Sequence, residues 1–170
     1  MRTVVKVPEE RMAVIMGTRK STVRHIAKET GTKISKEDND VVIEGDALDV
    51  WNAQHIVKAI GRGFSPHRAL ALLDNSHILE IIDLTDYCKD PQIERIKGRV
   101  IGMEGKSRKA IEHYTGALIS VYGKTISIIG QHISVSIAKS AIMMLVEGSN
   151  HSTVYKLLER ERKRRIKDIL

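Results

Sequence analysis

The first half of the chain alternates short apolar runs with polar segments, and the spacing of the apolar positions changes from one segment to the next. The β-branched segment 3–7 is typical of a strand, and Pro8 ends it. Gly31 ends the helical pattern that precedes it. The predicted elements are a strand over 3–7, helices over 9–16 and 21–30, strands over 33–35 and 41–44, and a helix over 49–60. This last helix should bury one face, formed by Val50, Ala53, Val57 and Ile60.

The second half of the chain follows the same order. The predicted elements are a strand over 78–84, helices over 91–101 and 106–115, strands over 118–121 and 125–129, and a closing helix. The closing helix carries apolar residues at four-residue intervals, which predicts a buried stripe formed by Ile133, Ile137, Ala141 and Leu145.

Two further helices are predicted outside this order. Ser65 is the expected N-cap of a short helix to residue 73, with Pro66 at its first position. Ser152 is the expected cap of a final helix, which carries Val154, Leu157 and Leu158 before it becomes strongly charged.

An internal repeat explains the common order. Shifting the sequence by 85 positions places Gly17 on Gly102 and aligns residues 17–45 with 102–130 without a gap. Apolar residues and glycines keep this register: Ile26 falls on Ile111, Gly31 on Gly116, Ile34 on Ile119, Ile43 on Ile128 and Gly45 on Gly130. Two copies of one α+β fold are therefore predicted, at 1–74 and 75–170, each an antiparallel three-stranded sheet with helices on one face.

Composition narrows the choice of partner. The chain has 170 residues with 28 Lys and Arg against 21 Asp and Glu, a formal net charge of +7. This balance favours a polyanionic partner, and nucleic acid before a membrane surface. Residues 75–170 hold 16 basic against 11 acidic side chains, and residues 1–74 hold 12 against 10. Aromatic residues make up 4%, which argues against folds that read RNA by stacking bases on Phe and Tyr.

Several classes of protein are not expected. Cys88 is the single cysteine, which excludes an internal disulfide framework and a cysteine-cluster metal site. No basic segment followed by an apolar run resembles a secretory signal. Polar residues interrupt the apolar stretch 126–146, which makes it a poor membrane span. We therefore expect a reduced, cytoplasmic protein that needs no cofactor and no membrane.

The strongest chemical feature is the glycine pair Gly102 and Gly105 between two predicted helices. Without a Cβ, both positions let a ligand come close to the backbone, and the next helix directs its free N–H groups at the same point. Phosphate suits such a loop. One G-x-x-G pair is usually a mere turn, but here the surrounding pattern is repeated and dense positive charge surrounds it. The nearby cations are Arg95, Lys97, Arg99, Lys106, Arg108 and Lys109.

Enzymatic sites are not predicted. The segment 105–107 imitates the end of a P-loop, but Val100 occupies the position of its first glycine and a helix precedes it instead of a strand. The histidines form no H-x-x-x-H pair. Asp83 and Asp86 are explained by solvation at a strand end, and Ser107 has no evident base beside it. We expect no catalytic residue and no metal ligand.

The order of elements around the glycine pair resembles the type I KH RNA-binding domain. Other segments resemble one family, the archaeal tandem-KH relatives of the eukaryotic partner-of-Nob-one protein, a small-ribosomal-subunit assembly factor. The matching segments are 63–66 with 69–73, 95–102, 105–108, 128–130 and 151–155, so the resemblance extends over nearly the whole chain.

The resemblance implies a non-enzymatic protein that binds single-stranded RNA near the 3′ end of the 16S-type rRNA during assembly of the small subunit. It also implies two protein partners, the endonuclease that trims this end and, in archaea, a subunit of a translation initiation factor. KH folds clamp single-stranded RNA over the G-x-x-G loop. The expected RNA-binding residues are Arg95, Lys97, Arg99, Ile101, Gly102, Met103, Glu104, Gly105, Lys106, Ser107, Arg108, Lys109 and Ile119.

The first copy departs from the KH pattern because Lys20 replaces the second glycine. A long side chain then stands where the RNA backbone should pass, so we expect weaker RNA binding in this copy. Its expected residues are Gly17, Thr18, Arg19, Lys20 and Arg24. Two alternatives remain open: a regulator of translation or RNA decay that binds other RNAs, and a KH-fold scaffold for protein partners. The basic segment 160–167 is either a solvated helix face or an arm along RNA phosphates.

Overall fold

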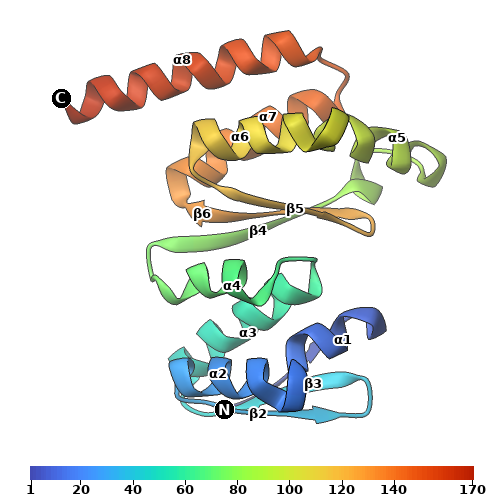
Figure 1. Ribbon diagram of the computed structural model, residues 1–170, viewed down its shortest axis with the longest axis vertical. Helices are drawn as coiled ribbons and strands as arrows, with labels where there is room; N and C mark the ends of the chain where they lie inside the picture. Colours follow the sequence, from blue (N-terminus) through green and yellow to red (C-terminus); the bar gives the residue numbers. More distant parts are fainter. The chain divides into compact units, whose positions relative to one another are not determined.

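The computed structural model describes all 170 residues, and the chain divides into two compact units, Met1–Leu79 and Glu80–Leu170. In each unit the helices cover one face of a three-stranded antiparallel sheet (Figure 1), as the sequence predicts for an α+β fold with two KH-like copies. The boundary predicted from the sequence, between residues 74 and 75, lies a few residues before this division.

The first unit contains the predicted elements in the predicted order. They are β1 (Arg2–Lys6), α1 (Glu9–Met16), α2 (Ser21–Thr30), β2 (Lys33–Glu37), β3 (Asp40–Glu44), α3 (Ala47–Gly61) and α4 (Pro66–Ala69), with 3-10 turns at Thr18–Lys20 and Leu70–Leu73. The strand order is β1-β3-β2, which places β3 in the centre and leaves β2 at an edge. Val41 and Ile34 are paired across the sheet with Val5 and Ile43.

The core of the first unit lies between the sheet and α3. Val50, Ala53, Val57 and Ile60 are fully buried, which confirms the face predicted for this helix. Ser65 caps α4, since its hydroxyl oxygen accepts a hydrogen bond from the Arg68 N–H at 3.3 Å, and Pro66 is the first helical residue, also as predicted.

The second unit repeats this architecture and adds a helix. Its elements are β4 (His77–Asp83, which begins at the end of the first unit), α5 (Asp90–Ile101), α6 (Lys106–Thr115), β5 (Leu118–Tyr122), β6 (Thr125–Gln131), α7 (His132–Val146) and α8 (His151–Ile169), with 3-10 turns at Leu84–Asp86 and Met103–Gly105. The strand order is β4-β6-β5, so that β5 is an edge strand. The predicted strand to residue 84 is one residue too long, because the Asp83 carboxylate accepts the Thr85 N–H and turns the chain.

The stripe predicted for α7 is confirmed at Ala141 and Leu145, whereas Ile137 is only partly buried and Ile133 is exposed. Ile133 is 60% exposed, whereas Val135, Ala138, Ile142 and Leu145 are buried. A helix turns about 100° per residue, so strict four-residue spacing drifts around it by about 40° per step. The buried positions instead alternate between steps of three and four residues.

The cap predicted for the final helix is also wrong. Asn150 is the N-cap of α8, and its side-chain oxygen accepts the Thr153 N–H at 2.9 Å. Ser152 lies inside the first turn and donates to the same oxygen. The helix packs on α6 and α7, on the side away from the sheet (Figure 1), through the buried residues Val154 and Leu158. No helix of the structure is both long and apolar enough to cross a membrane.

An ion pair links the first strand of the second unit to α7. Lys139 donates from Nζ to Glu80 Oε1 at 2.7 Å. This hydrogen bond and the charge of the carboxylate raise the pKa of Lys139 above its usual value. Both side chains are more than a third exposed, so we expect the pair to contribute little to stability.

Candidate RNA interface

The loop between α5 and α6 has a backbone that glycine makes possible. Gly102 has φ 74° and ψ 173°, and Gly105 has φ 76° and ψ 12°, both outside the range that L side chains usually adopt. Helix α6 begins at Lys106, directly after the second glycine. Because the first N–H groups of a helix have no partner within it, this end of α6 offers donors and a partial positive charge to an anion at the loop.

The corresponding loop of the first unit has the same shape although Lys20 replaces the second glycine. Gly17 has φ 72° and ψ 173°, and Lys20 has φ 61° and ψ 27°. The residues between them also match, with φ 53° at Arg19 and 55° at Glu104. The substitution therefore changes the side chain at the loop and leaves its backbone path in place.

Five of the predicted RNA-binding residues lie at the surface around the second loop. Met103 is 85% exposed. The other exposed residues are Arg95, Glu104, Lys106 and Lys109. Beside the loop, a shallow hollow of about 500 Å³ is lined by Met103, Lys106, Lys109 and two ring side chains of α6, His113 and Tyr114. The structure thus gathers cations and flat side chains at the place where the backbone can hold a phosphate.

Arg99, one of the predicted RNA-binding residues, makes two contacts within the fold. Its guanidinium group donates from Nε to the carbonyl oxygen of Leu145 at 3.2 Å and from Nη2 to that of Ser149. These carbonyls lie at the end of α7 and just beyond it, and that of Leu145 also accepts the Gly148 N–H at 3.3 Å. Arg99 therefore ties α5 to the end of α7, and we do not include it among the phosphate contacts.

The first unit uses an arginine in the same way. Arg11 of α1 donates from Nε to Ile60 and from Nη2 to Phe64, both at 2.9 Å. The 85-position shift places these two carbonyls on those that Arg99 binds in the second unit. Because both copies satisfy the same pair of carbonyls, the contact belongs to the fold. This contact could not be predicted from the repeat, because the 85-position shift does not place Arg11 on Arg99.

Three other predicted residues are buried or paired. Ser107 is 1% exposed, and Ile119 is 2% exposed. Lys97 donates to Glu94 at 3.3 Å, with 17% of its side chain exposed. Ile101 is partly exposed. The side chains of Ser107 and Ile119 therefore support the loop and the sheet from inside.

Glu112 connects Arg108 to the edge strand β5. Its Nη1 donates to Glu112 Oε1 at 2.8 Å, and the other carboxylate oxygen accepts the backbone N–H of Ile119 at 2.8 Å. The side chains of Arg108 and Glu112 are 28% and 15% exposed. Glu112 was not predicted as a site residue, because its role depends on a strand seven residues away.

The corresponding groove of the first unit is an open, positively charged hollow. Its volume is about 690 Å³, and it lies between α2 and the edge strand β2. Lys20 and Arg24, both predicted, line it together with Lys33 and Lys36, which the sequence analysis missed. The available signal was the presence of two lysines in one short predicted strand region, on either side of Ile34 and Ser35.

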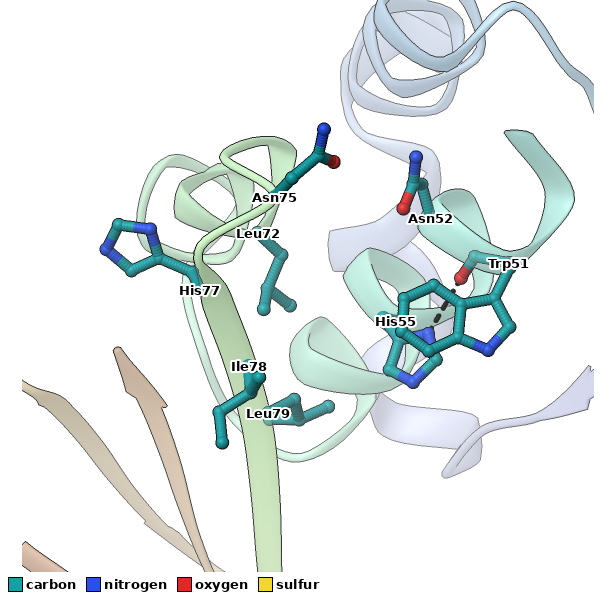
Figure 2. Close-up of a pocket in the computed structure, with 8 residues that line it drawn as sticks. All are labelled: Trp51, Asn52, His55, Leu72, Asn75, His77, Ile78 and Leu79. Atoms are coloured by element: carbon teal, nitrogen blue, oxygen red, sulfur yellow. Dashed lines mark hydrogen bonds between the residues drawn. The ribbon is translucent and has the colours of Figure 1, made fainter. Parts of the chain in front are cut away.

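A second hollow of the first unit differs from the groove in the residues that line it. About 250 Å³ in volume, it lies between α3 and residues 72–79 (Figure 2), and no Lys or Arg lines it. Trp51 is 54% exposed and lies against His55, with ring centroids 4.1 Å apart and ring planes tilted by 42°. His55 Nδ1 donates to the Trp51 carbonyl at 2.7 Å. At its rim, the Ser76 hydroxyl and N–H donate to Asp74 and lower the pKa of that carboxyl group. This hollow lacks the charge that phosphate requires.

No group of three or more His, Cys, Asp or Glu side chains is placed to hold a metal ion. His113 is exposed on α6, where its Nε2 lies 3.4 Å from Arg162 Nη1 of α8. Asp83, at the end of β4, accepts hydrogen bonds from the N–H and the hydroxyl of Thr85.

The chain matches KH-domain models in both units. A model described as eukaryotic type KH-domain (KH-domain type I) matches residues 78–163, and a KH domain model matches residues 2–59. A KH domain-containing protein of Methanocaldococcus jannaschii is 48% identical over 168 residues, which cover 95% of this chain and 74% of that protein.

Eukaryotic proteins are more distant. The RNA-binding protein pno-1 of Caenorhabditis elegans is 28% identical over 163 residues, which cover 89% of this chain and 59% of that protein. The pre-rRNA-processing protein pno1 of Aspergillus fumigatus is 32% identical over 114 residues, which cover 65% and 45%. This chain thus spans about half the length of these eukaryotic relatives.

A solved complex from Pyrococcus horikoshii, which contains a/eIF2alpha, aDim2p and rRNA, includes a chain of the same fold. It matches this protein with a TM-score of 0.91 at 46% identity and covers 96% of this chain and 95% of that chain. These matches extend over both units and agree with the repeated glycine loop. The chain belongs to the KH-domain family, as a tandem KH protein of the type that includes PNO1 and archaeal Dim2p.

Proposed function

We propose that the protein binds single-stranded RNA near the 3′ end of small-subunit rRNA and acts in maturation of that rRNA. The observation that carries this proposal is the pair of loops of one backbone shape, each followed by a helix N-terminus and surrounded by exposed cations. Relatives are named as RNA-binding and pre-rRNA-processing proteins, and a structural neighbour was solved with rRNA.

The proposed binding mode follows from the geometry of the loops. A phosphate lies over each loop, where backbone N–H groups and nearby ammonium groups neutralise it, and the attached bases enter the groove beside the edge strand. Paired bases would not fit this groove, so the RNA is single-stranded. In the second unit, Gly105 keeps side-chain atoms off the phosphate path, whereas in the first unit Lys20 reaches over it. The second unit is therefore the main clamp.

The same proposal includes protein partners and no catalysis of its own. The RNA end would be presented to an endonuclease, and a subunit of a translation initiation factor would bind the same protein. The complex of a relative with a/eIF2alpha supports the second partner. The cytoplasm is the proposed location, since Cys88 is the single cysteine and is unpaired.

The decisive experiment compares RNAs of equal length with the full chain. We expect a single strand with the sequence of the 16S-type rRNA 3′ end to bind more tightly than a scrambled strand, and both more tightly than a duplex. The affinity should fall as salt rises, because phosphate contacts release counterions. Equal affinity for duplex, or a flat salt response, would contradict the proposed interface.

Crosslinking of RNA in cells separates the proposal from its two alternatives. Reads concentrated at the 3′ end of small-subunit rRNA support a role in maturation. Reads scattered over messenger RNAs would favour a regulator of translation or decay, and no reads would favour a protein scaffold.

A further inference from the structure

The last helix, α8, carries a straight row of cations on its outward face. A helix turns about 100° per residue, so residues spaced by four, three and four positions stay within about 60° of one another. The side chains of Val154 and Leu158, on the opposite side of α8, are buried against the second unit. The α8 row consists of Lys156, Arg160, Lys163 and Lys167, all of them exposed.

The α8 row does not stabilise the helix that carries it. Lys156 and Arg160 are four residues apart, as are Lys163 and Lys167, and like charges at this spacing destabilise a helix. The ion pair within α8 joins Lys163 to Glu159 at 3.4 Å, with more than half of each side chain exposed. The helix holds seven basic and three acidic residues, so most of its positive charge is not neutralised within it.

The KH fold does not account for the α8 row either. The 85-position shift places Pro66 on His151, so that α4 and α8 begin at equivalent positions of the two units. Helix α4 has four residues and α8 has 19. The first unit therefore completes the same fold without a long basic helix, and α8 is an addition to the unit that has both loop glycines.

Contacts at its two ends show that α8 runs alongside α6. Near its start, His151 Nε2 lies 2.8 Å from the carbonyl oxygen of Arg99, close to the end of α5. Farther along, Arg165 Nη1 donates to the carbonyl oxygen of Thr115, the last residue of α6, at 3.1 Å. Because the glycine loop joins α5 to α6, the α8 row leads away from the neighbourhood of this loop along α6 (Figure 1).

The hollow beside the loop lies on the path from the loop to α8. It is lined by Lys106, Lys109 and the ring of Tyr114, and the Arg162 guanidinium of α8 lies over this ring, 5.7 Å from its centroid. Glu112, which binds the edge strand β5, projects from the opposite side of α6. The path is therefore separate from the KH groove. Cations beside an aromatic ring are typical of surfaces that bind single-stranded nucleic acid without sequence preference.

We infer that this hollow and the α8 row bind the backbone of single-stranded RNA that continues beyond the glycine loop of the second unit, without selecting its sequence. A KH loop holds about four nucleotides, and the four cations of the α8 row add about four phosphate contacts. The inference rests on the proposed RNA binding. It extends that function by making the site longer than a KH groove, with an outer part that recognises charge.

Two RNAs of different length test the inference. The first is a hexamer with the sequence of the 16S-type rRNA 3′ end, and the second is the same hexamer with six uridines added on each side. Fluorescence anisotropy at several salt concentrations gives the affinity of the full chain for each RNA. The longer RNA should bind more tightly, and its salt slope should be steeper by about 2–3, since each single-strand phosphate contact contributes about 0.7.

Two double variants show whether α8 causes this difference. Lys156→Gln with Arg160→Gln removes two charges of the α8 row and keeps good helix formers there. This variant should lower the salt slope for the longer RNA by about 1.4 and change the affinity for the hexamer by less than about twofold. Lys6→Gln with Lys28→Gln removes the same charge from exposed positions of the first unit and should leave both slopes nearly unchanged.

The outcomes separate this inference from the proposed function. Equal affinity for the two RNAs, an equal loss for both in the α8 variant, or the same loss in the first-unit variant would overturn the inference. Failure of the wild-type protein to bind either RNA at low salt would instead refute the proposed function. As a measurement independent of affinity, 4-thiouridine in the added segments should crosslink to α8 under ultraviolet light, and crosslinks confined to the first unit would also overturn the inference.

Discussion

Gly102 and Ser107 lie so close that no side chain fits between them. A Cβ built on Gly102 would be 2.7 Å from both the backbone nitrogen and the Cβ of Ser107. The first unit repeats this contact, since a Cβ on Gly17 would lie 2.7 Å from the Thr22 nitrogen. The first glycine of each loop is thus required by the packing of the loop against its own helix, as well as by any ligand above it.

We predict that Gly102→Ala destabilises the protein far more than Gly105→Ala. At Gly102 the new Cβ would clash with Ser107, and the backbone conformation there is one that residues other than glycine rarely adopt. Together these effects should lower the free energy of unfolding by about 2–4 kcal/mol. At Gly105 the nearest atom to a new Cβ is the flexible end of Lys109, at 3.7 Å, so only the left-handed conformation is penalised, by about 1 kcal/mol. Urea unfolding measures both values, and equal losses would show that the contact at Gly102 relaxes.

Substitutions at Arg99 and Arg95 should have different effects, the first on the stability of the fold and the second on RNA binding. Arg99→Met removes the side-chain donor to the Ser149 carbonyl and one of the donors to the Leu145 carbonyl, which should cost about 1–3 kcal/mol. Arg95→Ala, on the exposed face of the same helix, should leave the free energy of unfolding nearly unchanged and reduce the salt dependence of RNA binding by about one unit. A reduced salt slope in a folded Arg99→Met variant would return Arg99 to the phosphate contacts.

The relative importance of the two loops can be tested at one matched position. Met103 and Thr18 correspond in the repeat, and both are exposed beside their glycine loop. Aspartate at either position repels phosphate, and Met103→Asp should weaken RNA binding more than Thr18→Asp, because the second loop is the main clamp. If Thr18→Asp caused the larger loss with both proteins folded by circular dichroism, Lys20 would be an adapted phosphate contact.

Asn150→Ala should destabilise α8 by about 1 kcal/mol, because the Thr153 N–H loses its acceptor. Ser152→Ala is the control, since that hydroxyl only donates to the Asn150 side chain from within the first turn. Thermal unfolding of the two variants measures the difference. A larger effect of Ser152→Ala would restore the cap expected from the sequence.

Local chemistry was enough to predict the elements and the repeat. The bounds of α1, α2 and α6 agree with the sequence prediction at both ends. Glycine at 17, 31 and 116 ends these three helices through its freedom to take positive φ. The α+β fold and the glycine loops follow from patterns within a few tens of residues. These features depend on residues that are close together in the chain, so they can be predicted from the sequence.

The roles of individual polar side chains depended on residues far away in the sequence. Arg95 and Arg99 lie one turn apart on α5, yet Arg99 donates to the carbonyls at the end of α7 and Arg95 is exposed. Glu112 acquires its role from the edge of β5, and Lys33 and Lys36 acquire theirs from the hollow beside α2. The sequence gives the type and the position of a charged side chain but not the groups that surround it in the folded protein. Whether it binds a ligand or a carbonyl of its own chain is decided by the acceptors that folding brings within about 3 Å of it.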